Sequence, residues 1–136
     1  QTAKFYFFDT GVSHFLAGTE TLERNSNLWG NSFEQFILME LKAYNSYCQK
    51  HADICYWRSV DGYEVDFIIN SKIAIEVKSS KKIGSDHLKG LKAIRDEKCI
   101  QRCIIVSEDT TEKLKDSIEH YCWRTFLNHL WSHKIF

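Results

Sequence analysis

Two short apolar runs of the sequence contain charged residues whose types and spacing could perform chemistry. The first run, EVDFII, contains Asp66, and the second, IAIEVK, contains Glu76 and Lys78. Alternate residues of a β-strand point to opposite faces, so Glu76 and Lys78 are expected to share one face. Burying charges in hydrophobic strands is costly unless a metal ion, a substrate or a partner charge compensates them. The sequence therefore predicts a functional use for these three side chains.

The turn between the two runs decides whether the two acids meet. If that turn has three residues, Asn70–Lys72, Ile69 pairs with Ile73 and Asp66 lies opposite Glu76. The β-carbons of the two acids would then be about 5 Å apart. A two-residue turn would place them on opposite faces, unless a β-bulge restored the register. A shared site therefore requires the three-residue turn or a bulge.

Carboxylates arranged in this way suit a hard divalent cation such as Mg²⁺, or Mn²⁺ in its place. Asp66 and Glu76 would supply two ligands, and the backbone carbonyl of Val77 a third. Glu34, near the start of a predicted helix, would reach the metal directly or through water. Lys78 would lie beside the metal-bound water, where it would orient the attacking hydroxide or neutralise a scissile phosphate.

A structural alternative uses the same residues without a metal. In that alternative Asp66 and Lys78 form a cross-strand ion pair, and Glu76 lies on a sheet edge. The apolar residues on each side of the acids, the tight turn between the runs and the preceding helix with Glu34 favour the metal site.

The spacing of apolar residues predicts the elements that position these side chains. From Phe33 to Tyr47 the apolar residues recur every three or four positions and predict the longest helix, with Asn31 or Ser32 as its N-cap. The Asp-Gly pair at 61–62 predicts a hairpin turn. The remaining predicted elements are a buried strand at 4–8, helical turns at 12–16, strands at 54–59, 63–69, 73–77 and 102–107, a helix at 85–98, and one or two helices after residue 110.

Together these elements predict an α/β fold with a central mixed sheet of about four or five strands flanked by helices. The helix between the strands at 73–77 and 102–107 favours a parallel crossover. An apolar stripe near the end of the chain is expected to be core, with packing against a missing domain or a second subunit as the alternative. Its members are Ile118, Cys122, Phe126, Leu130 and Trp131.

Composition limits the class of protein. The 136 residues are expected to form one domain, and 18 basic residues balance 18 acidic ones, so any affinity for DNA must come from a local patch. Four lysines that follow the second apolar run, Lys81, Lys82, Lys89 and Lys92, could contact a phosphate backbone. No apolar run has the length of about 20 residues that spans a bilayer, so no membrane partner is expected. Five cysteines with irregular spacing suit reduced thiols in a cytoplasmic protein.

In this order, the helix glutamate Glu34, the hairpin aspartate Asp66 and the Glu76-x-Lys78 pair resemble the PD-(D/E)xK phosphodiesterase superfamily. The resemblance implies the restriction-endonuclease-like fold. It also implies that Glu34, Asp66 and Glu76 hold one or two Mg²⁺ ions, and that Lys78 serves catalysis.

Four stretches are similar, more narrowly, to the uncharacterised domain at the C-terminus of many prokaryotic AAA-type ATPases. They are KFYFFDTGV, LWGNSFEQFILMELK, YWRSVDGYEVDFII and IAIEVKSS. The resemblance implies that residues 1–136 are the C-terminal fragment of a longer ATPase, and that ATP binds only in the missing N-terminal module. That module, DNA and a second copy of the chain are the expected partners.

Two functions follow from these residues. The first is a Mg²⁺-dependent nuclease-like domain that hydrolyses DNA phosphodiester bonds. The alternative is a non-catalytic domain of the same fold that regulates the ATPase or binds a protein partner, which the zero net charge favours. A dimerisation domain without a ligand is a third, weaker option.

Overall fold

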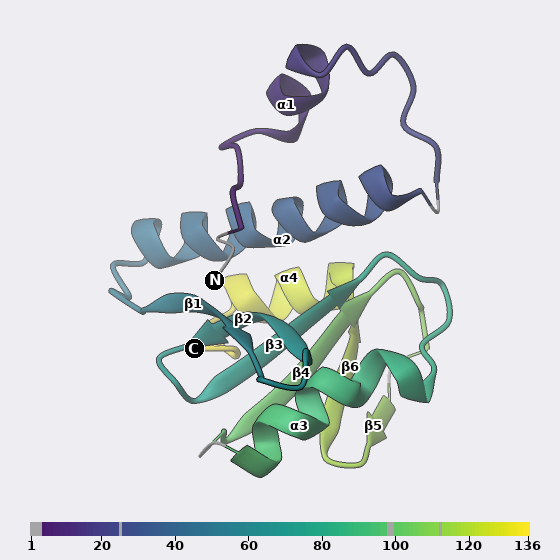
Figure 1. The fold of residues 1–136 in the computed structure, drawn as a ribbon. Helices are drawn as coiled ribbons and strands as arrows, with labels where there is room; N and C mark the ends of the chain where they lie inside the picture. Colours follow the sequence, from purple (N-terminus) through teal and green to yellow (C-terminus); the bar gives the residue numbers. More distant parts are fainter. Residues whose placement is uncertain (1–3, 25, 98–99, 112) are drawn as a thin grey trace.

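The structure is a computed structural model that describes residues 4–24, 26–97, 100–111 and 113–136. One mixed β-sheet forms its centre, and helices flank it (Figure 1). The elements in chain order are α1 (Thr10–Leu16), α2 (Asn27–Tyr47), β1 (Ile54–Arg58), β2 (Glu64–Ile69), β3 (Ile73–Lys78), the 3₁₀-helix η1 (Ser85–Leu88), α3 (Lys89–Glu97), β4 (Arg102–Ser107), β5 (Lys113–Lys115), β6 (Ile118–Cys122) and α4 (Trp123–Trp131).

The strands lie in the order β1-β2-β3-β4-β6-β5. The pairs β1–β2, β2–β3 and β5–β6 are antiparallel, whereas β3, β4 and β6 run parallel. The predicted α/β class, the mixed sheet and the parallel passage from β3 through α3 to β4 are therefore confirmed. The described sheet has six strands rather than four or five, because β6 and the short edge strand β5 form where helices alone were predicted. The three residues of β5 are too few for an alternating apolar pattern.

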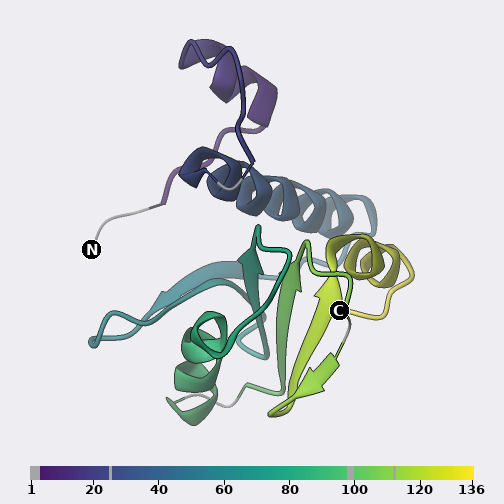
Figure 2. The ribbon, with the colours of Figure 1, turned by 90° about the vertical axis from the view of Figure 1, so that its right-hand side faces the viewer.

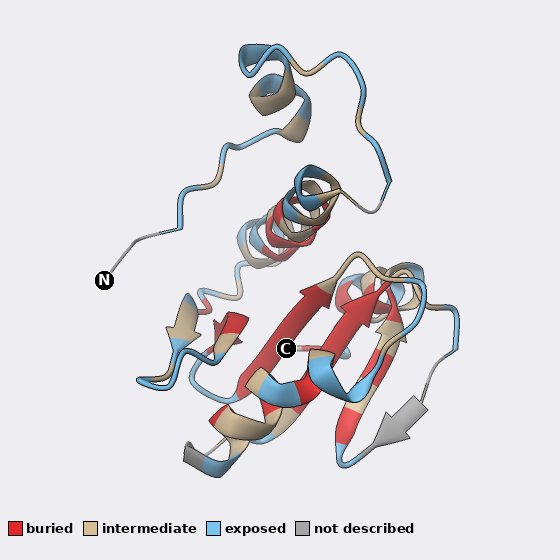
Figure 3. Ribbon diagram, turned by 45° about the vertical axis from the view of Figure 1, so that its right-hand side comes forward, coloured by how far each residue is buried: buried red, intermediate tan, exposed pale blue. Residues whose placement is uncertain are grey.

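Helices cover both faces of the sheet (Figure 2). On one face α2 and α4 pack over the odd-numbered residues of β3, which are Ile73, Ile75 and Val77. On the other face α3 packs over Ala74 and its neighbours. Burial follows this layering, with the central strands buried and the N-terminal segment largely exposed (Figure 3). The strands on the two sides of the predicted site thus lie in the interior layer.

Helix α2 begins earlier than predicted. Its N-cap is Ser26, not Asn31 or Ser32, and the Oγ of Ser26 accepts a hydrogen bond from the backbone N–H of Trp29 at 3.1 Å. Serine satisfies an otherwise unpaired N–H at this position, so the helix gains a turn that includes Gly30. A β-carbon at Gly30 would lie 3.4 Å from the Ser79 Oγ, so the loop after β3 approaches α2 closely at this glycine.

The prediction of a strand at 4–8 is wrong. These residues form no regular element, and the Phe5 and Phe8 side chains are 83% and 77% exposed. The segment pairs with no strand and runs beside α2, where the Gln35 side chain donates a hydrogen bond to the Phe7 carbonyl at 2.8 Å. It reaches the sheet through the Lys4 side chain. The aromatic run therefore does not bury itself in a strand. The helical turns predicted next are confirmed as α1, which Asp9 caps through the N–H of Val12.

The C-terminal region contains two strands and one helix among the described residues, not only helices as predicted. Ile118 and Cys122 are buried on β6, and Phe126 and Leu130 are buried on α4. A spacing of four residues keeps side chains on one face of either a helix or a strand, so the stripe did not distinguish the two. Its assignment to the core holds for these four residues, whereas Trp131 is 41% exposed.

Two negative findings concern the described residues only. No helix within them is long and apolar enough to cross a membrane. The four cysteines that they include, Cys48, Cys55, Cys103 and Cys122, are free thiols. Cys99 and the predicted helix end at Lys98 lie outside the described residues.

Candidate metal centre

The turn between β2 and β3 has the three residues that a shared site requires. Ile69 pairs with Ile73 and Phe67 pairs with Ile75, the register predicted for an Asn70–Lys72 turn. Both Asn70 and Ser71 have positive φ angles, of 50° and 56°, which the tight turn imposes. The regular pairing extends to Phe67 and Ile75, so Asp66 and Glu76 follow directly at its end.

A β-bulge changes where Asp66 points. Cys55 of β1 pairs with Ile68 of β2, but Trp57 pairs with Val65. The same stretch therefore contains one more residue on β2 than on β1. As a result Val65 packs on the α3 side of the sheet and Phe67 on the α2 side, although they are two residues apart. The irregularity falls at Asp66. Bulges commonly redirect a side chain in this way.

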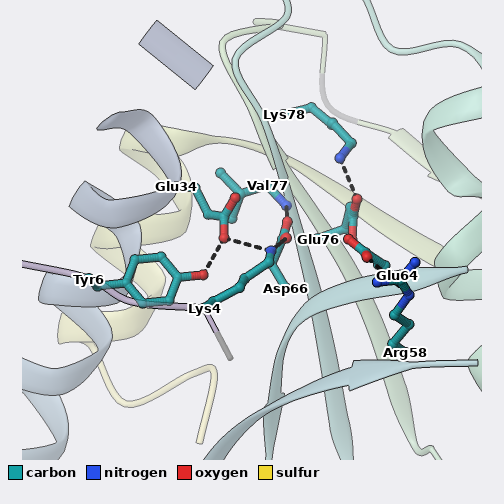
Figure 4. A network of polar contacts seen from close by, with 9 residues as sticks. All are labelled: Lys4, Tyr6, Glu34, Arg58, Glu64, Asp66, Glu76, Val77 and Lys78. Carbon is teal, nitrogen blue, oxygen red and sulfur yellow. Dashed lines mark hydrogen bonds and ion pairs between the residues drawn. The ribbon is translucent and has the colours of Figure 1, made fainter. Parts of the chain in front are cut away.

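The redirected Asp66 carboxylate has partners on two sides. Its Oδ2 accepts the backbone N–H of Val77 at 2.9 Å, and its Oδ1 lies 3.0 Å from the Nζ of Lys4. Lys4 also lies 3.0 Å from the Oε1 of Glu34 in α2 (Figure 4). The same Glu34 oxygen accepts a hydrogen bond from the hydroxyl of Tyr6. Glu34 and Asp66, which come from different elements, thus converge on one cation, and that cation is the Lys4 ammonium group.

This role of Lys4 and Tyr6 was not predicted from the sequence. Both belong to the segment that was expected to be a strand, and no spacing rule connects them with residues 28 or more positions away. Burial lowers the pKa of Lys4, but the charges of Asp66 and Glu34 outweigh burial and hold the pKa above its ordinary value. Burial and the hydrogen bond to Glu34 raise the pKa of Tyr6. Lys4 is therefore a permanent cation and Tyr6 a neutral donor.

Glu76 is as deeply buried as Asp66, more so than Glu34, and is incompletely paired. Its Oε1 is 2.5 Å from the Nζ of Lys78, whereas its Oε2 is buried without a hydrogen-bond partner among the described residues. Burial and the negative charge of Asp66 together raise the pKa of Glu76 to about 7, against the opposing effect of Lys78. A buried carboxylate with an unpaired oxygen near a second carboxylate indicates a place for a cation.

Lys78 is predicted to remain charged. Burial lowers its pKa, but the adjacent Glu76 carboxylate raises it more, and the pKa stays above the ordinary value. Lys78 pairs with Glu76 on its own strand, and Asp66 pairs with Lys4. The structural alternative, an Asp66–Lys78 pair with Glu76 at a sheet edge, is therefore wrong. β3 is an inner strand, because pairing to β2 and β4 encloses it.

The donor set fits a hard divalent cation in its chemistry, but the present arrangement does not form a complete ligand shell. Among the described residues no group of three or more His, Cys, Asp or Glu side chains is placed to hold a metal ion. Glu34 and Asp66 converge on Lys4, while Glu76 turns to Lys78. Val77, whose carbonyl was predicted to be a ligand, contacts the site through its backbone N–H, which donates a hydrogen bond to Asp66. A metal would have to replace the Lys4 ammonium.

Four of the charged side chains, Lys4, Glu34, Asp66 and Lys78, line one surface pocket, which has a volume of about 470 Å³. Glu64 also lines it, an acid that the sequence interpretation did not single out, and its carboxylate lies 3.4 Å from the Nε of Arg58. Glu76 is not among the lining residues. The pocket is lined by Lys4, Phe5, Tyr6, Asn31, Glu34, Gln35, Glu64, Asp66 and Lys78.

Comparison with known proteins gives one match. Residues 29–126 match the model of a domain of unknown function, DUF4143. The matched range includes the four predicted site residues, Glu34, Asp66, Glu76 and Lys78, and excludes Lys4. It confirms the similarity to the uncharacterised C-terminal domain of AAA-type ATPases. No curated protein and no solved structure matches the chain significantly. Because the match spans more than half of the sequence, the chain belongs to the DUF4143 family of domains of unknown function.

Proposed function

We propose that this domain is a metal-dependent phosphodiesterase of the PD-(D/E)xK type that acts on DNA. One observation carries the proposal: Glu34 and Asp66, from α2 and β2, hold a single cation at 3.0 Å from each carboxylate, in the pocket that Lys78 also lines. Carboxylates that converge on one positive charge are the arrangement that Mg²⁺ or Mn²⁺ requires. We further propose that the domain is attached to an N-terminal ATPase module, as the sequence resemblance implies.

The chain's own residues would divide the chemistry as follows. A bound divalent ion would supply a Lewis acid and an activated water. Glu34 and Asp66 would hold this ion, and the Oε2 of Glu76 would provide a further oxygen after Glu76 loses its proton. Lys78 stays an ammonium, so it is suited to neutralise charge on the scissile phosphate and not to accept a proton.

Lys4 would have to leave before a metal binds. The segment at 4–9 forms no helix or strand, and side-chain contacts attach it to the pocket: the Lys4 ion pairs, the Lys4 ammonium over the Tyr56 ring, the Tyr6–Glu34 hydrogen bond and the bond from Gln35 to the Phe7 carbonyl. Displacement of the Lys4 side chain alone breaks its ion pairs and its contact with Tyr56, whereas Tyr6, which packs against the core, would stay in place. In this proposal the metal and Lys4 compete for Glu34 and Asp66.

Titration calorimetry with Mn²⁺, combined with a plasmid and single-stranded DNA cleavage assay, tests the proposal. Asp66→Ala and Glu76→Ala are expected to lose Mn²⁺ binding and cleavage, and the exposed substitution Asp61→Ala, in the β1–β2 turn, serves as the matched acidic control. Unchanged Mn²⁺ affinity in both site variants would contradict the proposal. Folding of each variant is checked by thermal melting, because Asp66→Ala leaves the Val77 N–H and Lys4 unpaired.

The second candidate is a non-catalytic domain that regulates the ATPase or binds a protein. Lys4 and Lys78 already neutralise much of the acidic charge without a metal. In addition, Phe5, Phe8 and Phe15 near the N-terminus are at least 77% exposed, which favours a contact with another protein surface. This candidate predicts neither Mn²⁺ binding nor cleavage of any DNA form in the assay above.

A further inference from the structure

A second cavity, distinct from the acidic pocket, lies where three parallel strands end. β3, β4 and β6 run in the same direction, so the residues after Lys78, Ser107 and Cys122 meet at one edge of the sheet. Ligands of open α/β sheets commonly bind at this edge. The cavity has a volume of about 560 Å³, and its lining includes Arg24, Trp29, Lys81, Glu108, Trp123 and Arg124.

The charges around this cavity are mostly positive. Arg24, Lys81 and Arg124 come from three separate segments, and the lining includes one acid, Glu108. Glu108 already accepts a hydrogen bond from the indole N–H of Trp29 at 2.6 Å. The whole chain has no net charge, so this local excess is not a consequence of composition. Basic side chains that converge from distant segments favour an anionic ligand.

Flat aromatic surfaces accompany the positive charges. The guanidinium of Arg24 lies 5.5 Å from the Trp29 ring centre, and that of Arg124 lies 4.3 Å from the Trp123 ring centre. Phe36 packs edge-on against Trp123, which fixes that ring against α2. Tryptophan faces beside arginines are the surfaces on which nucleobases stack while phosphates meet the basic groups. The volume lies in the range of about 300 to 1,000 Å³ typical of small-molecule sites.

The cavity and the acidic pocket lie on neighbouring sides of the same helix. Ser32 and Phe33 line the cavity, whereas Asn31 and Glu34 line the acidic pocket. The loop after β3 connects them as well, because Lys78 belongs to the pocket and Lys81 to the cavity. A polynucleotide that reaches Lys78 would therefore pass close to the cavity.

We propose that this cavity binds one nucleotide of a single-stranded nucleic acid, with its base stacked on a tryptophan and its phosphate on Arg24, Lys81 or Arg124. A free mononucleotide has the same chemistry, but the neighbouring pocket favours a nucleotide within a strand. The preference for a strand over a free nucleotide rests on the proposed function. Binding itself requires no metal and no cleavage.

Fluorescence anisotropy with a short fluorescein-labelled oligothymidylate, in EDTA, tests the inference. The variant Lys81→Glu/Arg124→Glu reverses two exposed charges of the cavity and is expected to bind at least about tenfold more weakly. The control variant Lys42→Glu/Lys134→Glu reverses two exposed lysines elsewhere and is expected to bind like the wild type. Trp29→Leu is expected to weaken binding by about fivefold or more, and Trp29→Phe to restore most of it. Thermal melting verifies that each variant is folded.

The outcomes separate this inference from the proposed function. Equal weakening in the cavity and control variants, or no binding by the wild type, overturns the inference. Thymidine monophosphate that competes as strongly as the unlabelled oligonucleotide overturns the assignment to a strand. A protein that binds the oligonucleotide through the cavity but does not cleave with Mn²⁺ supports the inference and contradicts only the proposed function. Cleavage that persists while the cavity variant binds normally contradicts only the inference.

Discussion

The acidic pocket and the basic cavity lie on neighbouring sides of α2, but their charges are paired in opposite ways. In and beside the pocket every described lysine has a carboxylate partner: Lys4 meets Glu34 and Asp66, and Lys78 meets Glu76. In the cavity three basic side chains surround a single acid, which a tryptophan already engages. We therefore propose that the first site exchanges one cation for another, whereas the second has an excess of positive charge that suits an anionic ligand. Four predictions test this difference.

The largest effect is expected from Lys78→Ala. Removal of a preorganised charge that stabilises a developing anion lowers turnover by about 10²- to 10³-fold. Because Lys78 is a cation and not a ligand, Mn²⁺ affinity is expected to stay equal or to increase. Rates from a DNA cleavage assay and affinities from calorimetry give the two quantities. A variant that cleaves at the wild-type rate would remove Lys78 from the proposed chemistry.

The next effect concerns pH and Glu76. The pKa of Glu76 is raised to about 7, so the folded protein holds this proton more tightly than the unfolded chain does. Its stabilising contribution is fully present below about pH 4.5 and is lost as the pH rises through about 7. The size is on the order of 3 kcal/mol, since one pKa unit corresponds to about 1.4 kcal/mol.

Urea unfolding without metal, at several pH values between about 5 and 8, measures this contribution. The Glu76→Gln variant lacks the titrating proton, so its free energy of unfolding should fall less over this range than that of the wild type. Parallel curves for the two proteins would show that Glu76 ionises normally. Added Mn²⁺ should reduce the fall in the wild type, because a cation stabilises the ionised carboxylate.

A smaller effect is expected from Lys4→Met, which removes the ammonium group that competes with the metal. Mn²⁺ affinity should rise by about tenfold, because a charged hydrogen bond contributes on the order of 1.5 kcal/mol. Without metal, the same variant should be less stable than the wild type, since Glu34 and Asp66 lose their shared partner. Calorimetry on Lys42→Met provides the control at an exposed position of α2. Weaker Mn²⁺ binding by Lys4→Met would mean that Lys4 supports the metal site.

The smallest effect is expected from Ser26→Ala, which removes the N-cap of α2. The loss of such a cap costs about 1 kcal/mol. Helix α2 contributes to both the pocket and the cavity, so Mn²⁺ binding and oligonucleotide binding should weaken together by a small factor, and Ser26→Asp should restore both. If Ser26→Ala weakened only one of the two binding activities, the other site would not depend on the first turn of α2.

The hairpin and its charges could be predicted from the sequence because their determinants are local. The turn at Asn70–Lys72 fixes the register, and the apolar runs around Asp66 and Glu76 identify the strands. The bulge at Asp66 could not be predicted, because it arises from the pairing with β1, a segment about ten residues away that carries no bulge signal of its own. The partners Lys4 and Tyr6 were missed because tertiary contacts with α2, not local propensity, decide the path of their segment.

The end of the chain shows a different limit of sequence interpretation. The apolar residues of β6 and α4 follow each other at four-residue intervals, which a helix and a strand both satisfy. Burial was predicted correctly there, but the type of element was not. The basic cavity was missed for a related reason. Its cations lie far apart in the sequence: Lys81 and Arg124 meet because the parallel strands β3 and β6 end at one edge, and Arg24 comes from the segment before α2.

The most direct measurement is a crystal structure of the domain with Mn²⁺, with anomalous scattering used to locate the ion. We expect one Mn²⁺ peak between the carboxylates of Glu34 and Asp66, with the Lys4 ammonium displaced from its 3.0 Å contacts and the Oε2 of Glu76 turned towards the ion. Lys4 still bound to both carboxylates at saturating Mn²⁺, with no anomalous peak in the pocket, would contradict a metal-dependent site in this domain.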